Sequence, residues 1–218
     1  MRFGGHFYSQ GDATANRYDY YSGGVAAVHS LAPINEIAGH KEQYSMPNDE
    51  QTLLKARRFT VVEKTVTRAD GQVASVQYVK HLGSVAILPL LDDGSVCLIR
   101  SRRLTVGETL IEVPAGTREP NESPLETARR ELAEETGYRA TSFEELTAYF
   151  PSPGVLSERM WIFVAKGLTA GPPAREANEE IENLIVSWDD ALAMVDSREI
   201  QDGKTIVALL AYHRLQSA

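Results

Sequence analysis

Three glutamates between positions 131 and 135 are the side chains of this sequence best suited to chemistry. On a helix, Glu131 and Glu135 lie one turn apart, and Glu134 projects about 60° to the side of Glu131 because successive residues turn by about 100°. Three carboxylates this close repel one another unless a cation joins them, and hard oxygen ligands favour Mg²⁺ or Mn²⁺. Arg130, four residues before Glu134, can hold that carboxylate in place. The spacing predicts a metal platform; a solvated acidic helix face is the alternative.

A well-capped helix is predicted to carry these glutamates. Ser123 is a favoured N-cap residue, Pro124 suits the first helical position, and Glu126 completes a capping box. Gly137 can adopt the left-handed conformation that commonly ends a helix. The stripe expected to be buried is Leu125, Ala128 and Leu132. We therefore expect a helix that begins at Ser123 and ends at Gly137.

The rest of the chain is predicted to form strands, followed by two closing helices. Strands are expected over 59–68, 72–80, 84–91, 95–100, 109–113, 144–150, 160–165 and 184–186, and helices over 187–195 and 202–214. Asp70-Gly71 and Asp92-Asp93-Gly94 carry turn chemistry and predict two successive hairpins. The continuous apolarity of 84–91 and 95–100 indicates a sheet buried on both faces. An α/β or α+β fold with a mixed sheet between helices is expected.

Composition narrows the class of protein. The 218 residues suffice for one domain with an extra N-terminal segment, and residues 1–50 are expected to form an irregular arm, unless their aromatic residues dock on a neighbouring subunit. The net charge of −8 excludes a general attraction to nucleic acid or to an anionic membrane. Cys97, the single cysteine, lies in an apolar run and is expected to be a buried, inert thiol. Without a signal peptide or membrane span, a soluble cytoplasmic protein is expected.

The segment 116–138 resembles the Nudix box. That pattern is Gly, five residues, Glu, seven residues, Arg-Glu, an aliphatic residue, one residue, Glu-Glu, one residue, Gly and an aliphatic residue. The fixed positions are filled here by Gly116, Glu122, Arg130, Glu131, Glu134, Glu135 and Gly137. Tyr138 stands where an aliphatic residue is usual, a change expected to affect packing rather than chemistry. The resemblance implies a Nudix-type α/β/α sandwich with a mixed β-sheet, preceded here by an N-terminal β-ribbon, that hydrolyses a nucleoside diphosphate linked to another moiety.

The same likeness implies roles for individual residues. Glu131 and Glu135 would be metal ligands, and Glu134 a ligand or a partner of metal-bound water. Arg130 would orient these groups, and Ala115, just before the box, would offer its backbone carbonyl to a metal. Mg²⁺, or Mn²⁺ in its place, is the implied cofactor; it would neutralise the diphosphate, hold it in line and lower the pKa of the attacking water.

The sequence around the box resembles the ADP-ribose pyrophosphatase subgroup. The likeness runs over 59–213, with matching motifs at 111–116, 151–154, 157–159, 178–181 and 200–205. It implies that Arg103, Glu112 and Arg118 bind substrate. Arg102, Arg103 and Arg118 can each pair with a phosphate or ribose group, or equally with a surface carboxylate. Ser101 departs from the glutamine that the subgroup often has, which leaves the substrate open.

The loop at 151–159 offers a candidate general base. Pro153-Gly154 fixes a turn that is expected to present Glu158 from a second direction, facing the helix carboxylates. A carboxylate in that place can accept a proton from the attacking water. A surface glutamate in a turn is the alternative for Glu158.

These observations lead to one expected function and two alternatives. The expected function is Mg²⁺-dependent hydrolysis of ADP-ribose, or of a close nucleoside diphosphate sugar, to a nucleoside monophosphate and a sugar phosphate. The alternatives are a hydrolase of another sugar nucleotide such as GDP-mannose, and a catalytically silent regulator that binds ADP-ribose. A silent protein would be expected to lose one of Glu131, Glu134, Glu135 or Glu158, and all four are present.

The resemblance also implies a homodimer, because relatives often exchange N-terminal strands and build each site from two chains. Residues 59–80 would be the exchanged ribbon. The expected organisation is an arm of unknown role at 1–50, a β-hairpin region at 51–82 that can form the dimer, and a Nudix hydrolase domain at 83–218.

Overall fold

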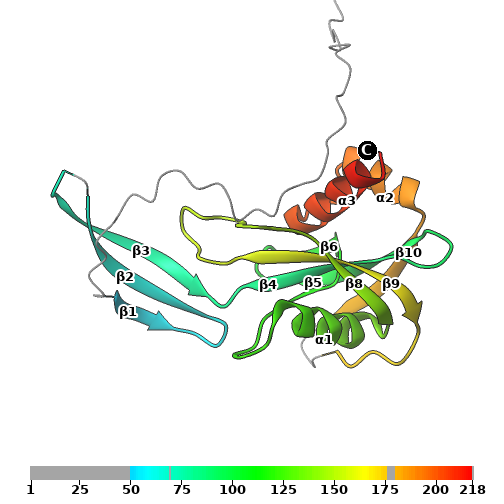
Figure 1. The fold of residues 1–218 in the computed structure, drawn as a ribbon, viewed down its shortest axis with the longest axis horizontal. Helices are drawn as coiled ribbons and strands as arrows, with labels where there is room; N and C mark the ends of the chain where they lie inside the picture. The colour runs from blue at the N-terminus through cyan, green and yellow to red at the C-terminus, as the bar shows by residue number, and fades with distance from the viewer. Residues whose placement is uncertain (1–49, 69, 176–179, 218) are drawn as a thin grey trace, which may run out of the picture. The chain divides into compact units, whose positions relative to one another are not determined.

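The computed structural model describes residues 50–68, 70–175 and 180–217. Most of the arm expected at 1–50, and part of the motif at 178–181, therefore lie outside the described residues. The elements, in chain order, are β1 (Glu50–Lys55), β2 (Phe59–Thr67), β3 (Val73–His81), β4 (Ser84–Pro89), β5 (Val96–Arg103), β6 (Glu108–Glu112), β7 (Ala115–Thr117), α1 (Pro124–Thr136), β8 (Arg139–Tyr149), β9 (Met160–Thr169), β10 (Ile181–Val186), α2 (Trp188–Asp196) and α3 (Gly203–Gln216) (Figure 1).

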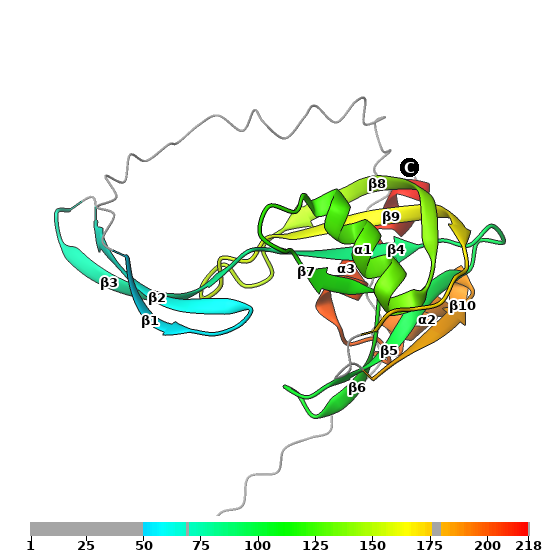
Figure 2. The same ribbon diagram turned by 90° about the horizontal axis from the view of Figure 1, so that it is seen from below.

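Two sheets lie between helices, and β4 is an inner strand of the larger one. One sheet has the order β7-β4-β9-β8, with β4 parallel to β9, and the other has the antiparallel order β10-β5-β6. Because successive strand residues point to opposite faces, Val85 and Ile87 pack in the cluster that includes α1, while Ala86 and Leu88 pack in the cluster that includes α2 and α3. Figures 1 and 2 show α1 on one face and α3 on the other. The predicted mixed α/β/α sandwich is confirmed.

The second predicted hairpin is wrong. The strands at 84–91 and 95–100 form as expected, and Gly94 adopts the left-handed conformation in the turn between them. Only the isolated bridge between Leu90 and Val96 joins the two segments, since β4 pairs with β7 and β9, and β5 with β6 and β10. Both strands are buried along most of their length, as the apolar runs indicated, but apolarity alone does not specify which strands pair.

The N-terminal ribbon has three strands rather than the two predicted. The hairpin of β2 and β3 is confirmed, and β1 pairs antiparallel with β2. Every residue of β1 is exposed, so its sequence lacks the alternation of apolar and polar residues that marks a half-buried strand. The short β7 was also not predicted, and β8 begins at Arg139, five positions before the predicted start at 144.

The predicted burial of Cys97 is confirmed. Its side chain is fully buried in β5, and burial raises the pKa of the thiol to about 12. No helix among the described residues combines the length and the apolarity needed to cross a membrane.

Candidate active site

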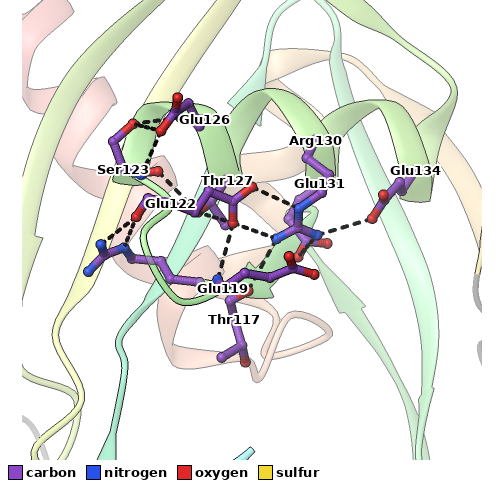
Figure 3. Close-up of polar contacts among 10 residues, drawn as sticks. Thr117, Glu119, Glu122, Ser123, Glu126, Thr127, Arg130, Glu131 and Glu134 are labelled. Carbon is purple, nitrogen blue, oxygen red and sulfur yellow. Dashed lines mark hydrogen bonds and ion pairs between the residues drawn. The ribbon is translucent and has the colours of Figure 1, made fainter.

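Helix α1 is fixed at its N-terminus by the predicted capping box. Ser123 Oγ accepts a hydrogen bond from the Glu126 amide, and the Glu126 carboxylate accepts one from the Ser123 amide at 2.7 Å (Figure 3). Gly137 ends the helix in the left-handed conformation, with φ 81°. Both caps lie where the sequence predicted them, so Glu131, Glu134 and Glu135 lie in the last turns of α1, as expected.

A cavity of about 260 Å³ lies beside the acidic edge of α1. It brings the three predicted metal ligands together with Ala115 and with arginines from several elements. The lining residues are Arg57, Arg58, Leu82, Arg103, Ala115, Gly116, Thr117, Arg118, Glu119, Pro120, Arg130, Glu131, Glu134 and Glu135. The carboxylates therefore face a concave site, and the alternative of a purely solvated acidic face does not describe them.

Arg130 organises the carboxylates around it. Its Nη1 donates to Glu131 at 2.7 Å and to Glu134 at 3.1 Å, while Nε and Nη2 donate to Glu122 at 2.9 and 3.0 Å (Figure 3). Nη2 also reaches the Thr117 carbonyl at 3.3 Å. The hydrogen bonds from Arg130 lower the pKa of Glu122 to about 2, and Arg130 has its own pKa raised by the same contact. One guanidinium thus joins the loop before α1 to the helix.

The glycine of the box gives Glu131 its place. A Cβ built on Gly116 would lie 1.9 Å from Cδ and from Oε1 of Glu131, so any other residue overlaps the carboxyl group. Glu135 is held from the same strand, because the Ala115 amide donates to its Oε2 at 2.9 Å. Glu131 and Glu135 are buried at 9% and 4% exposure, and the side chain of Glu134 remains 39% exposed.

The donor chemistry fits a hard divalent cation. The carboxylates line a cavity, and Gly116 allows β7 to lie close to Glu131. Carboxylate oxygens are ligands that Mg²⁺ accepts. Among the residues that the structure describes, no three acidic, histidine or cysteine side chains are already gathered closely enough to hold a metal. Arg130 pairs with Glu131 and Glu134, and the Ala115 amide pairs with Glu135. Each of these hydrogen bonds uses one carboxylate oxygen, and a carboxylate has further lone pairs that can coordinate a cation.

Arg103 lines the cavity, whereas Glu112, which was also predicted to bind substrate, is not among the lining residues. Glu112 is fully buried and accepts Arg103 Nε at 2.7 Å and Nη2 at 2.6 Å. Lys204 of α3 also donates to Glu112, and its Nζ lies 2.9 Å from Asp202. The hydrogen bonds that Arg103 donates to Glu112 raise the pKa of Arg103, and contacts with Arg103 and Lys204 hold the pKa of Glu112 low despite its burial. Glu112 thus positions Arg103 rather than facing the cavity.

Arg118 lines the cavity, and each nitrogen of its guanidinium donates a hydrogen bond to a main-chain carbonyl. Nε and Nη2 donate to the Glu122 carbonyl, Nη1 donates to the Leu82 carbonyl at 3.2 Å, and the guanidinium lies 5.2 Å from the Trp161 ring centroid. Arg102, the third candidate arginine, is exposed and is not among the cavity residues.

Comparisons with known proteins agree with this geometry. The sequence model of the NUDIX domain matches residues 80–209, more than half of the chain. The chain belongs to the Nudix family. An ADP-ribose pyrophosphatase of Bacillus subtilis (strain 168) is 36% identical over 177 residues, which cover 78% of this chain and 95% of the relative.

Other relatives of this Nudix chain carry different names. A methanol dehydrogenase activator of Bacillus methanolicus is 33% identical over 151 residues, covering 68% of this chain and 81% of that protein. A GDP-mannose pyrophosphatase of Yersinia enterocolitica is 30% identical and covers 74% of this chain and 92% of its own length. A solved structure of an ADP compounds hydrolase matches with TM-score 0.68 and 22% identity, over 78% of this chain and 92% of that one, which supports the fold.

Glu158 lies outside the cavity that the Nudix box lines. Its Oε1 accepts Ser84 Oγ at 2.5 Å and lies 3.5 Å from His81 Nδ1, which itself accepts the Gly83 amide. The predicted orientation toward the helix carboxylates is therefore absent in this structure. The cause is strand β3, whose Val79 amide and carbonyl bind the 151–159 loop and turn it toward the ribbon.

Two arginines of the cavity were missed in the sequence. Arg57 and Arg58 lie in the turn between β1 and β2, close to the Nudix box in space but far from it along the chain. The adjacent basic pair before a strand was the available signal. It could not be placed because β1 itself was not recognised.

Proposed function

We propose that this Nudix protein hydrolyses the diphosphate bond of ADP-ribose, or of a related nucleoside diphosphate sugar, and releases a nucleoside monophosphate and a sugar phosphate. The observation that carries the proposal is the cavity, which is lined both by the box carboxylates and by arginines. These arginines are Arg57, Arg58, Arg103, Arg118 and Arg130. Carboxylates suit a divalent cation and arginines suit phosphate oxygens, so the two sets together match a metal-bound diphosphate. The names of the relatives in Bacillus subtilis and Yersinia enterocolitica support this class of substrate.

Four groups of the chain would bind the divalent cation. Glu131, Glu134, Glu135 and the Ala115 carbonyl would hold Mg²⁺ or Mn²⁺, with Arg130 orienting the carboxylates. When bound, the cation supplies charge neutralisation for the diphosphate and acidifies the attacking water.

Substrate binding falls to the arginines. Arg103 would contact a phosphate directly, because Glu112 fixes the position of its guanidinium. Arg57 and Arg58 line the same cavity and add positive charge. Arg118, bound to main-chain carbonyls, would contribute positive charge to the cavity.

Two carboxylates compete for the role of proton acceptor. Glu134 lines the cavity and is the most exposed of the three box carboxylates, so it can reach an attacking water. Glu158 would need to leave Ser84 and His81 before it could act on a substrate in this cavity. The geometry favours Glu134, and Glu158 remains the second candidate.

A panel of substrates tests the proposal. ADP-ribose, GDP-mannose, other sugar nucleotides and dinucleotides are assayed with Mg²⁺ and with Mn²⁺, and the products are identified by chromatography. We expect ADP-ribose to give AMP and ribose 5-phosphate only when a divalent cation is present. Preferential cleavage of GDP-mannose would select the alternative that Ser101 leaves open. Tight binding of ADP-ribose without turnover would instead select a regulator, the class suggested by the relative named as an activator.

The protein is further proposed to be a homodimer formed through the ribbon at 51–82, with the hydrolase domain at 83–218 and no role assigned to 1–50. The ribbon carries apolar side chains that its own three strands leave in solvent, including Leu53 at 49% and Leu54 at 53% exposure. A second copy is the partner that would cover them. A cytoplasmic location is part of this proposal, supported by the single thiol of Cys97.

Light scattering tests the dimer. We expect twice the chain mass of 24.0 kDa for the wild type, and a single chain for Leu54→Glu, because a charge in the covered face costs desolvation. Leu215→Glu is the matched control, since Leu215 is similarly exposed at the end of α3 and its replacement should leave the dimer intact. A wild-type mass of one chain would contradict the proposal.

A further inference from the structure

The C-terminal turn of α1 is closed by residues that lie far from it in the sequence. The last four carbonyls of a helix have no partner within the helix. In α1 each of them accepts a hydrogen bond from the protein. The pairs are Gly137 N to Ala133 O at 3.1 Å, Ala174 N to Glu134 O at 2.9 Å, Arg175 Nε to Glu135 O at 2.8 Å and Asn183 Nδ2 to Thr136 O at 2.8 Å. Three of the four donors come from the segment between β9 and β10 and from β10 itself.

The two side-chain donors also hold each other. Arg175 Nη2 donates to Asn183 Oδ1 at 2.9 Å, and both side chains are partly buried. Asn183 is anchored in β10, where it pairs with Ile99 of the buried strand β5. The last turn of α1 contains no basic residue, so Arg175 is the cation supplied to the negative end of the helix dipole. This pair, Arg175 and Asn183, fastens the end of α1 to the core sheet.

The fastened carbonyls belong to the turn that carries two box carboxylates. Glu134 and Glu135 point their side chains into the cavity while their backbone carbonyls bind Ala174 and Arg175. A frayed last turn would move both carboxylates, and metal sites lose affinity when the groups that orient their ligands are removed. Resting on the proposed function, we infer that Arg175 and Asn183 are positioning residues for the metal-binding carboxylates.

The direction in which the Kd for a divalent cation changes in Arg175→Met distinguishes a positioning role from a purely electrostatic one. Removing a cation near Glu135 raises the local negative potential, which by itself strengthens the binding of a divalent cation. Displacement of the carboxylates has the opposite result and weakens the binding of the cation. Weaker metal binding in Arg175→Met therefore reports positioning, and tighter binding reports charge alone.

Binding of Mn²⁺ to the full chain, followed by electron paramagnetic resonance, tests the inference. We expect the Kd of Arg175→Met to rise by about tenfold, within the range found for residues that orient metal ligands. Arg175→Lys keeps the charge but loses the paired donors, and is expected to weaken binding as well. Asn183→Ala should act in the same direction. The control is Arg214→Met, which removes an exposed arginine from the last turn of α3 and should leave the Kd unchanged.

The outcomes distinguish a failure of the proposed function from a failure of the inference about Arg175 and Asn183. Wild-type protein that binds no Mn²⁺ would contradict the proposed function and the inference together. Wild-type binding with an unchanged or lower Kd in Arg175→Met would overturn the inference alone. Thermal melting accompanies each variant, and if Arg175→Met does not fold, Arg175→Lys and Asn183→Ala decide the matter. A fall in melting temperature without a change in the Kd of the folded variants would assign the pair a structural role only and overturn the inference.

Discussion

Replacing Glu135 by glutamine is expected to lower kcat by roughly 100-fold or more, beyond the loss usual for residues that only orient a metal ligand. Glutamine has the same shape, and its amide oxygen can still accept the hydrogen bond that the Ala115 amide gives to Oε2 at 2.9 Å. The fold is therefore expected to persist, with a melting temperature near that of the wild type. What disappears is the negative charge on which binding of a divalent cation depends.

Steady-state kinetics over a range of Mg²⁺ concentrations measures the effect. Glu108→Gln is the control, because Glu108 is an exposed glutamate of β6 that does not line the cavity. It should retain the wild-type rate. A Glu135→Gln variant with nearly wild-type turnover would exclude Glu135 as an essential ligand.

The second large effect is expected for Gly116→Ala, in which the added methyl group collides with a carboxyl group. The new Cβ would lie 1.9 Å from Cδ of Glu131, far inside van der Waals contact, so either Glu131 leaves its place or β7 moves away from α1. Both movements displace a proposed metal ligand, and a displacement of about 1 Å can cost on the order of 100-fold in rate. We expect a loss of kcat of that size.

Gly203→Ala provides the matched comparison for Gly116→Ala. Gly203 begins α3, and a Cβ added there meets no atom within 4 Å. Its rate and melting temperature should stay close to those of the wild type. Full activity of Gly116→Ala would mean that Glu131 is not needed where the structure holds it, and the assignment of Glu131 as a ligand would fail.

Local signals made the helix of this site predictable. Ser123 and Glu126 are three residues apart and Gly137 adjoins the helix end, so both caps depend on neighbours in the sequence. The side of α1 that carries the carboxylates follows from helical periodicity alone. These local features are enough to place the three glutamates on one edge of α1.

Pairings between distant segments could not be predicted in the same way. Glu112 was expected to contact substrate, but its donor Lys204 stands 92 positions later, and no local pattern reports that such a partner will bury it. The apolar runs of β4 and β5 indicated burial without indicating which strands would cover them. The orientation of Glu158 was not predictable for a related reason. Its loop is held by a bridge between Val79 and Leu156, and these two residues are distant in the sequence.

The linked charges of Arg103, Glu112, Lys204 and Asp202 constrain any attempt to retarget this enzyme to a new substrate. A library that varies Arg103 alone leaves a fully enclosed glutamate with one of its two cations missing, and an unbalanced charge in such a place is strongly destabilising. Designers should therefore vary the four positions as a set, replacing Arg103 and Glu112 together, or start from a stabilised parent.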